Sequence, residues 1–72
     1  MAKKAGTVYR VTEVIGTSSS SWEDAARNAV STAAGTLRDL RIAEIEKLDV
    51  KIEDGKVTQF RARLALSFKY EG

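Results

Sequence analysis

Residues 56–70 have the sequence KVTQFRARLALSFKY, and apolar and polar side chains alternate along most of this stretch. One face of a strand built from it carries the apolar side chains Phe60, Ala62, Leu64, Leu66, Phe68 and Tyr70. The other face carries Gln59, Arg61, Arg63, Ser67 and Lys69. Alternation with a period of two is typical of a strand that is buried on one side. We therefore predict a long, half-buried strand over residues 56–70.

A partner strand is expected directly upstream, over residues 42–53. Asp54-Gly55 separates the two stretches, and this dipeptide favours a two-residue hairpin turn because both residues tolerate positive φ. A turn of this length fixes the pairing of all residues further along the two strands. The predicted pairs are Glu53 with Lys56, Glu46 with Arg63, Ile45 with Leu64, and Ala43 with Leu66.

This register places Leu48, Val50 and Ile52 on the face that carries Arg61, away from the apolar face of the last strand. Two arrangements are open. A β-bulge near residues 46–47 would rotate the three side chains inward, or they stay outward as an apolar patch. We favour the patch, because a small domain needs partner contacts and an exposed apolar patch normally marks an interface.

A helix is expected before the hairpin, over about residues 21–39. Apolar side chains recur there at helical spacing: Trp22, Ala25, Ala26, Ala29, Val30, Ala33, Ala34 and Leu37. Ser20 and Glu23 fit the capping box that often begins a helix, and Gly35 weakens the last turn. Because the apolar stripe is rich in alanine, the helix can lie close against a sheet.

The first strand is predicted over residues 7–15, TVYRVTEVI, which are rich in β-branched side chains and end at Gly16-Thr17. The element order is then β-α-β-β. If the first strand pairs with the third, the three-stranded sheet is antiparallel with strand order 1-3-2, and one helix covers one face. We predict a single α+β domain over residues 1–72, with residues 1–6 flexible.

The composition favours self-association. A chain of 72 residues buries only about 60% of the surface that its unfolded form exposes. Small domains compensate with disulfides, a structural metal or oligomerisation. Cysteine and histidine are both absent, so a bound metal would need oxygen ligands, which favours calcium or magnesium. We therefore expect a homo-oligomer.

Several classes of partner and location are disfavoured. The net charge is +2, with 12 basic and 10 acidic side chains interspersed, which is typical of a solvated surface and not of a nucleic-acid interface. The basic N-terminus leads into no apolar stretch that resembles a signal peptide or a membrane span. We expect a cytoplasmic protein that binds neither nucleic acid nor membrane.

The residues give little support for catalysis. Without histidine or cysteine, nucleophilic chemistry would need serine with lysine, and the serines of residues 18–21 lie at a helix start, where capping explains at least one of them. Glu44 and Glu46 share a strand face and could act as an acid–base pair or bind a cation, but we favour solvated carboxylates balanced by Arg63. Residues 16–18 before the helix could hold an anion, although they lack the spacing of a phosphate loop. We expect no enzymatic activity.

Five short segments, in their order and spacing, resemble the dodecin family over about residues 8–70. They are Val14-Ile15-Gly16-Thr17-Ser18, Trp22 in the alanine-rich helix, Thr36-Leu37-Arg38, Ile42-Ala43-Glu44-Ile45, and Ala65-Leu66-Ser67-Phe68. The resemblance implies β-α-β-β subunits in a hollow dodecamer that binds small ligands without catalysis. Family members bind flavins such as riboflavin or FMN in pairs near two-fold axes, and coenzyme A and metal ions are associated with them.

The resemblance also implies where a ligand would bind. The family's flavin-stacking tryptophan aligns with Ile42, and its flavin-binding glutamine aligns with Arg61. Isoleucine has no π-face, and arginine only donates hydrogen bonds and suits a phosphate or carboxylate. We expect Ile42, Glu44 and Arg61 to line the ligand site, on the face of the sheet turned away from the helix. The expected function is storage of a flavin or a related phosphate-bearing cofactor such as coenzyme A. The alternatives are binding of a cation such as calcium, or a purely structural shell.

Overall fold

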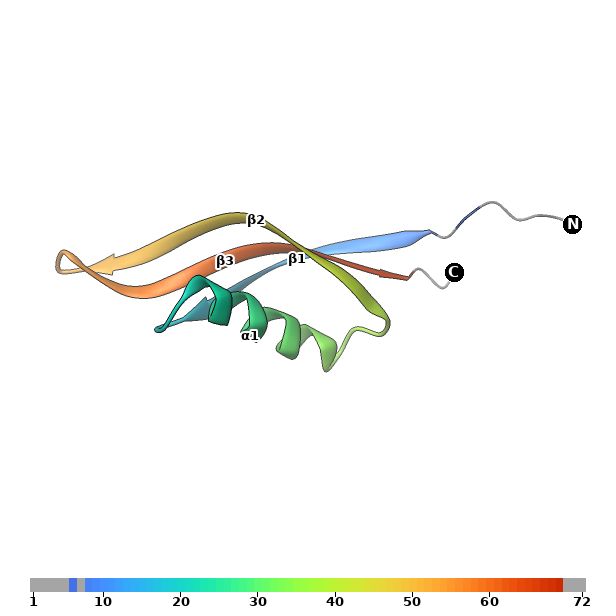
Figure 1. The fold of residues 1–72 in the computed structure, drawn as a ribbon, viewed down its shortest axis with the longest axis horizontal. Helices are drawn as coiled ribbons and strands as arrows, with labels where there is room; N and C mark the ends of the chain where they lie inside the picture. The colour runs from blue at the N-terminus through green and yellow to red at the C-terminus, as the bar shows by residue number, and fades with distance from the viewer. Residues whose placement is uncertain (1–5, 7, 70–72) are drawn as a thin grey trace, which may run out of the picture.

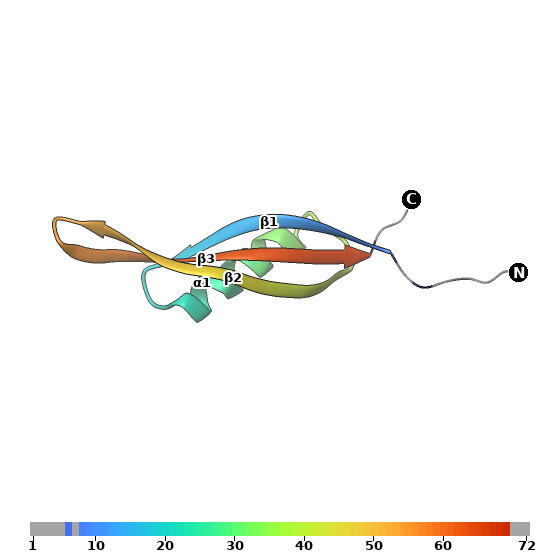
Figure 2. The same cartoon turned by 90° about the horizontal axis from the view of Figure 1, so that it is seen from above.

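The computed structural model describes residues 6 and 8–69, which form one three-stranded sheet and one helix. The elements are β1 (Tyr9–Ser18), α1 (Trp22–Ala34), β2 (Leu40–Glu53) and β3 (Lys56–Lys69). Both strand pairs are antiparallel, and β3 lies between β1 and β2 (Figure 1, Figure 2). This confirms the predicted α+β fold, the element order and the strand order 1-3-2. The predictions for residues 1–5, Thr7 and Tyr70 lie outside the described residues.

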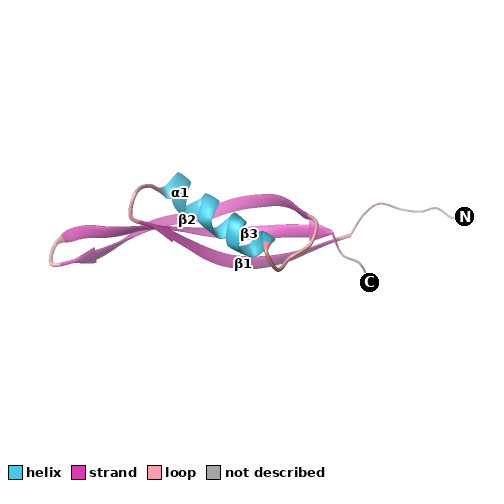
Figure 3. Cartoon of the chain, turned by 90° about the horizontal axis from the view of Figure 1, so that it is seen from below, coloured by secondary structure: helices cyan, strands magenta, loops and turns pink. Residues whose placement is uncertain are grey.

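The core lies between α1 and the alternating strand β3. Ala62, Leu64 and Leu66 are each at most 1% exposed, and they pack against three alanines of the helix, Ala25, Ala29 and Ala33. Alanine side chains let the helix lie close to the sheet, across which it runs obliquely (Figure 3). The small side chains also keep the buried apolar area low, so the core of a single copy is small.

The helix begins one residue later than the predicted capping box requires. Ser21 is the N-cap, and its hydroxyl accepts a hydrogen bond of 3.0 Å from the backbone N–H of Asp24. The Ser18 hydroxyl donates to the Asp24 carboxylate at 2.7 Å and accepts from the backbone N–H of Ser20 at 2.9 Å. The prediction that Ser20 and Glu23 form the cap is therefore wrong, because Asp24 takes the place expected for Glu23.

The helix ends at Ala34, five residues before the predicted end at Asp39. Gly35 is the C-cap, and the N–H groups of Thr36 and Leu37 both donate to the carbonyl of Ala33. Asp39 then adopts a positive φ of 56°, a conformation that aspartate tolerates better than most residues. The weak last turn noted in the sequence is thus the true end of the helix.

Strand β1 continues three residues past its predicted end, through Gly16 and Thr17 to Ser18. Gly16 pairs with Ala62 of β3, directly beneath the helix. A Cβ atom at this position would overlap the carbonyl oxygen of Ala25 and lie 2.7 Å from the Cβ of Ala29. Glycine is present because the helix approaches the strand this closely, and not because the strand breaks here.

The β2–β3 hairpin has the predicted turn, and its register shifts at three places, once at Arg41 near the start of β2 and twice at bulges nearer the turn. Asp54 and Gly55 have φ of 52° and 76°, as a turn of this type requires. Thr58 is an extra residue in β3 and Glu46 an extra residue in β2. The two insertions compensate one another, so the predicted pairs Glu53–Lys56, Ile45–Leu64 and Ala43–Leu66 are confirmed.

Between the two bulges the register differs by one residue from the predicted one. Leu48 lies opposite Ala62 and Val50 opposite Phe60, so both side chains are on the face that the helix covers. Lys47, instead of Glu46, lies opposite Arg63. The preferred prediction of an outward apolar patch is therefore wrong, and the alternative of a bulge near residues 46–47 is confirmed.

The helix nevertheless leaves much of this face uncovered. It lies over β1 and β3, while the β2–β3 hairpin projects beyond its first turn (Figure 1). Four apolar side chains on the helix side of the hairpin are between 49% and 62% exposed: Ile45, Leu48, Ile52 and Val57. We call these four residues the uncovered apolar face. Such a face on a small domain indicates a contact with another molecule.

Trp22 connects the first turn of the helix to the hairpin. Its indole N–H donates a hydrogen bond of 2.9 Å to the carbonyl oxygen of Asp49. Its ring meets the Phe60 ring edge to face, with centroids 5.2 Å apart. Trp22 remains 39% exposed, so it fixes the base of the hairpin and still presents surface to a partner.

Candidate functional site

The three predicted site residues all lie on the outer face, which we define as the face of the sheet turned away from α1. Ile42 is opposite Ser67, Glu44 is opposite Ala65, and Arg61 is opposite both Thr17 and Asp49. Each of these positions alternates with a helix-facing residue of the same strand. The predicted face is therefore the one on which the structure places all three side chains.

One copy of the chain does not bring the three residues together. Arg61 lies about 20 Å along β3 from Ser67, the residue opposite Ile42, at about 3.3 Å per residue. Glu44 is on the same strand face as Ile42 and is its neighbour. Ile42 and Glu44 can thus contact one small ligand together. Arg61 could join them only from a second copy.

Arg61 is held by Asp49 in a two-pronged ion pair. The Nε atom lies 2.7 Å from Oδ1 and the Nη2 atom lies 3.1 Å from Oδ2. The hydrogen bond from Arg61 lowers the pKa of Asp49 and raises the pKa of Arg61. Two N–H groups of the Arg61 guanidinium are already hydrogen-bonded to Asp49. A ligand that binds Arg61 in the same way would have to displace the Asp49 carboxylate. The sequence did not reveal this pair, because the predicted register puts Leu48 opposite Arg61.

A carboxyl pair forms in the middle of the outer face. The side chains of Glu13, on β1, and Glu46, the bulged residue of β2, share a hydrogen bond that raises the pKa of Glu46. Desolvation and the charges of Glu13 and Glu44 act in the same direction, while Arg63 opposes them. Two carboxyls in contact share a proton or bind a cation. The sequence suggested Glu44 and Glu46 here but gave no sign of Glu13.

The carboxyl pair is not by itself a metal site. Within residues 6 and 8–69, no group of three or more acidic side chains is arranged to hold a metal ion. Calcium takes six to eight oxygen ligands, so one copy supplies only part of a coordination shell. The remaining oxygens would have to come from water or from another copy.

The end of the outer face near the termini is apolar. Val11 on β1 and Ile42 on β2 flank Ser67 on β3, and their side chains are 61% and 62% exposed. Neither side chain has a charged neighbour directly across the sheet. This end of the face therefore offers apolar contact to a ligand or to a further copy, and the carboxyl pair lies next to it.

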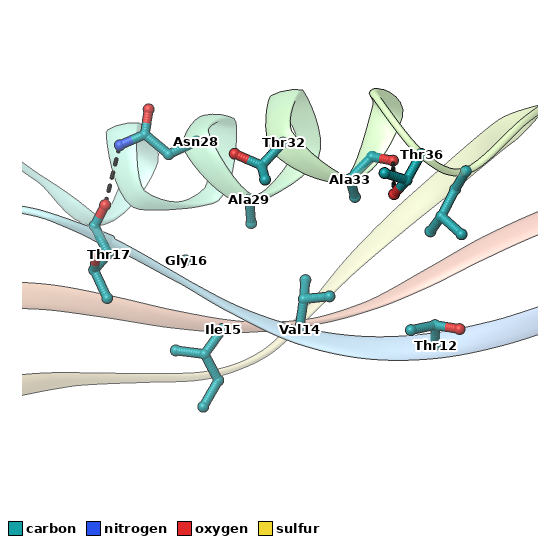
Figure 4. Close-up of a pocket in the computed structure, with 11 residues that line it drawn as sticks. Thr12, Val14, Ile15, Gly16, Thr17, Asn28, Ala29, Thr32, Ala33 and Thr36 are labelled. Atoms are coloured by element: carbon teal, nitrogen blue, oxygen red, sulfur yellow. Dashed lines mark hydrogen bonds between the residues drawn. The ribbon is translucent and has the colours of Figure 1, made fainter.

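A hollow of the described residues lies elsewhere, between β1 and α1 (Figure 4). It measures about 690 Å³ and is bordered by Val14 and by helix side chains that include Thr32. Asn28 closes one end with a hydrogen bond of 3.0 Å to the carbonyl of Thr17. None of the predicted site residues lines it. Asn28, Thr32 and Thr36 recur every four residues, and this polar stripe is the signal in the sequence that marks the hollow.

Two of the serines considered as nucleophiles, Ser18 and Ser21, form hydrogen bonds at the start of the helix. Ser18 bonds to Asp24 and to the N–H of Ser20, and Ser21 caps α1. Residues 16–18 belong to β1, and the helix covers Gly16. In the part of the chain that the structure describes, no helix is long and apolar enough to cross a membrane.

Comparison with known proteins gives a consistent result. The family model described as Dodecin matches residues 8–71. The chain is 42% identical to calcium dodecin of Mycobacterium tuberculosis over 64 residues, which cover 88% of this chain and 89% of that protein.

The solved structures agree with this assignment. Dodecin from Streptomyces coelicolor superposes with a TM-score of 0.88 at 42% identity, covering 96% of this chain and 99% of that one. Calcium dodecin from Mycobacterium tuberculosis, described as having a novel calcium-binding site, has a TM-score of 0.80 at 39% identity, covering 90% and 93%. With the β-α-β-β fold and the match along nearly the whole chain, these results establish that the protein belongs to the dodecin family.

Proposed function

We propose that this chain assembles with copies of itself into a non-catalytic, ligand-binding shell, and that its ligand is a calcium ion bound at the outer face. The observation that carries the choice of ligand is the contact between the Glu13 and Glu46 carboxyls. The proposal is supported by the similarity to calcium dodecin of Mycobacterium tuberculosis. A dodecamer is the assembly that we propose, as the family resemblance implies.

The need for assembly follows from the half-covered sheet. Each side chain of the uncovered apolar face keeps about half of its surface in water. Burying a whole leucine or isoleucine side chain stabilises a protein by about 1.5–3 kcal/mol, so completing the burial of four of them contributes several kcal/mol per copy. A chain with so small a core gains most of its stability in this way.

Calcium fits the donor chemistry of the outer face. Two carboxyls held together by the sheet repel one another when both are ionised, and a divalent cation removes that repulsion. Glu44 is a further oxygen donor on the same face, opposite Ala65. Because the described residues of one copy do not complete a site, we place the ion where outer faces of neighbouring copies meet.

A flavin or a phosphate-bearing cofactor suits these residues less well. Ile42 offers apolar contact but no aromatic stack. The guanidinium of Arg61, which could bind a phosphate, is already paired with Asp49 at 2.7 Å. We therefore propose calcium as the first candidate ligand and flavin or coenzyme A as the second. A shell that binds no ligand is the third alternative.

Calcium is expected to stabilise the protein. At about one hundred times its dissociation constant, a ligand that binds only the folded state contributes about 2.7 kcal/mol, which raises the melting temperature of a domain of this size by at least roughly 10 °C. Differential scanning calorimetry of protein treated with a chelator, with and without added calcium, measures this shift. Glu46→Gln, which keeps the size and removes the charge, should abolish most of it.

Glu53→Gln is the matched control, because Glu53 is an exposed carboxylate of the same strand that pairs with Lys51 at 3.5 Å. An equal loss in both variants would contradict the proposed site. The raised pKa of Glu46 also means that a proton competes with calcium at higher pH than usual, so calcium affinity should fall as the pH is lowered through this raised pKa. Without calcium, the contribution of Glu46 to folding is most favourable below its ordinary pKa and is lost as the pH rises through the raised value.

The double variant Ile42→Trp with Arg61→Gln is expected to create flavin affinity. Tryptophan restores an aromatic face, worth on the order of 1 kcal/mol beyond the area it buries, and glutamine both donates and accepts hydrogen bonds. Quenching of riboflavin fluorescence at micromolar protein measures the effect, and we expect it in the double variant and not in the unchanged protein. If quenching does not increase, the alignment of Ile42 and Arg61 with the family's flavin site is wrong.

A further inference from the structure

Three cations of the outer face, Lys47, Arg61 and Arg63, lie close to the carboxylate of Asp49, and Arg63 also acts on Glu46. Lys47 and Arg63 lie directly opposite one another, and Arg61 follows Arg63 on the same face of β3. Directly opposite residues in an antiparallel pair have Cβ atoms about 5 Å apart, and neighbours on one face of a strand are about 7 Å apart. Three cations at these spacings repel one another and attract an anion.

Asp49 supplies that anion from within the chain. Its carboxylate lies opposite Arg61, and both of its oxygens accept hydrogen bonds from the guanidinium. Arg61 and Arg63 both act to lower the pKa of Asp49, which places the carboxylate within the field of both arginines. The contact geometry is the fork that a guanidinium also makes with a phosphate group.

The position of the Asp49 backbone is fixed as well. The indole N–H of Trp22 donates to the carbonyl oxygen of Asp49 at 2.9 Å. This contact ties the middle of β2 to the start of the helix, while the Asp49 side chain points to the opposite face. The carboxylate is therefore presented to Arg61 by a backbone that is held from the other side of the sheet.

We propose that Asp49 determines the charge specificity of the outer face. Its carboxylate occupies the site on Arg61 that a phosphate group would otherwise take, and so it excludes phosphate-bearing anions from a face that is otherwise basic at this end. The inference deepens and rests on the proposed use of the outer face for ligand binding. It identifies one residue of this chain as the reason for a preference for cations over phosphate esters.

The test is the binding of inorganic pyrophosphate, measured by isothermal titration calorimetry at low salt with the assembled protein. Asp49→Asn keeps the size of the side chain and removes its charge. We expect this variant to bind pyrophosphate about tenfold more tightly than the unchanged protein. The double variant Asp49→Asn with Arg61→Gln should lose that gain, because the guanidinium fork is then missing.

Glu53→Gln is the matched control, since it changes the net charge by the same amount on the same strand without releasing Arg61. If Asp49→Asn binds pyrophosphate no better than Glu53→Gln, or if Arg61→Gln does not reverse the gain, the inference is wrong. Calcium is absent from this titration, so a failure here is distinct from a failure of calcium to stabilise the protein. Native mass spectrometry of each variant verifies that the assembly is intact.

Discussion

Replacing Gly16 with alanine is expected to lower the free energy of unfolding by about 3 kcal/mol, the upper end of the usual cost of overfilling a core. The added methyl group would overlap the backbone carbonyl oxygen of Ala25 and would lie 2.7 Å from the Cβ of Ala29. Neither atom can move aside as a flexible side chain could. The helix would have to shift away from β1, which opens the core around Ala62. Urea denaturation followed by circular dichroism measures the loss.

Gly35→Ala is the matched control for this substitution. Gly35 has a φ of −71°, which alanine adopts without strain, and the added Cβ would meet only the Thr32 carbonyl oxygen, at 3.3 Å. We expect its effect to stay within about 1 kcal/mol of the unchanged protein. If Gly16→Ala is as stable as Gly35→Ala, then the helix does not lie as close to β1 as the structure indicates.

Replacing Leu48 with aspartate is expected to prevent assembly. Leu48 is 49% exposed in a single copy, so the subunit itself tolerates a charge there. In an assembly that buries this face, an unpaired carboxylate costs several kcal/mol, and the cost recurs in every copy. We expect the dissociation constant between copies to rise by at least about a hundredfold, which corresponds to about 2.7 kcal/mol. Sedimentation velocity at several protein concentrations measures the change.

Thr58→Asp is the control, because it adds the same charge to the same hairpin at an exposed, polar position of the β3 bulge. This variant should assemble normally. If Leu48→Asp assembles as well as Thr58→Asp does, the uncovered apolar face does not form the contact between copies. Loss of assembly in both variants would indicate only that the hairpin tolerates no added negative charge.

The fold was predictable because its strongest signals are local. The alternation from Phe60 to Phe68 and the Asp54-Gly55 turn each determine one element without help from distant residues. The ends of α1 were predicted less well. Both Ser20 and Ser21 are suitable N-cap residues by type. The structure has Ser21 as the N-cap, where the contact of Ser18 with the Asp24 side chain holds Asp24 in the first turn.

The sequence left the bulge at Glu46 open as one of two arrangements and gave no indication of the bulge at Thr58, because both depend on tertiary structure. Thr58 and Glu46 each add one residue to one strand. The bulges are needed because Leu48 and Val50 would otherwise face away from the core side. A one-residue shift moves every side chain between the two bulges to the other face.

The sequence predicted which face of the sheet carries the candidate site, but it did not predict the contacts between side chains on that face. Ile42, Glu44 and Arg61 were chosen from the family resemblance and assigned to the outer face from the predicted register, and the structure places them on that face. The two contacts that characterise this face depend on the shifted register, namely Asp49 with Arg61 and Glu13 with Glu46. Glu13 and Glu46 are on different edge strands, so no spacing within one segment relates them.

Native mass spectrometry of the unchanged protein, diluted from micromolar to nanomolar concentration, tests most directly whether this subunit depends on its neighbours. One helix shields only part of the sheet, so we expect a single closed oligomer, a dodecamer, with no folded monomer at micromolar concentration. A monomer that stays folded on dilution, with a cooperative thermal transition of its own, would contradict the account.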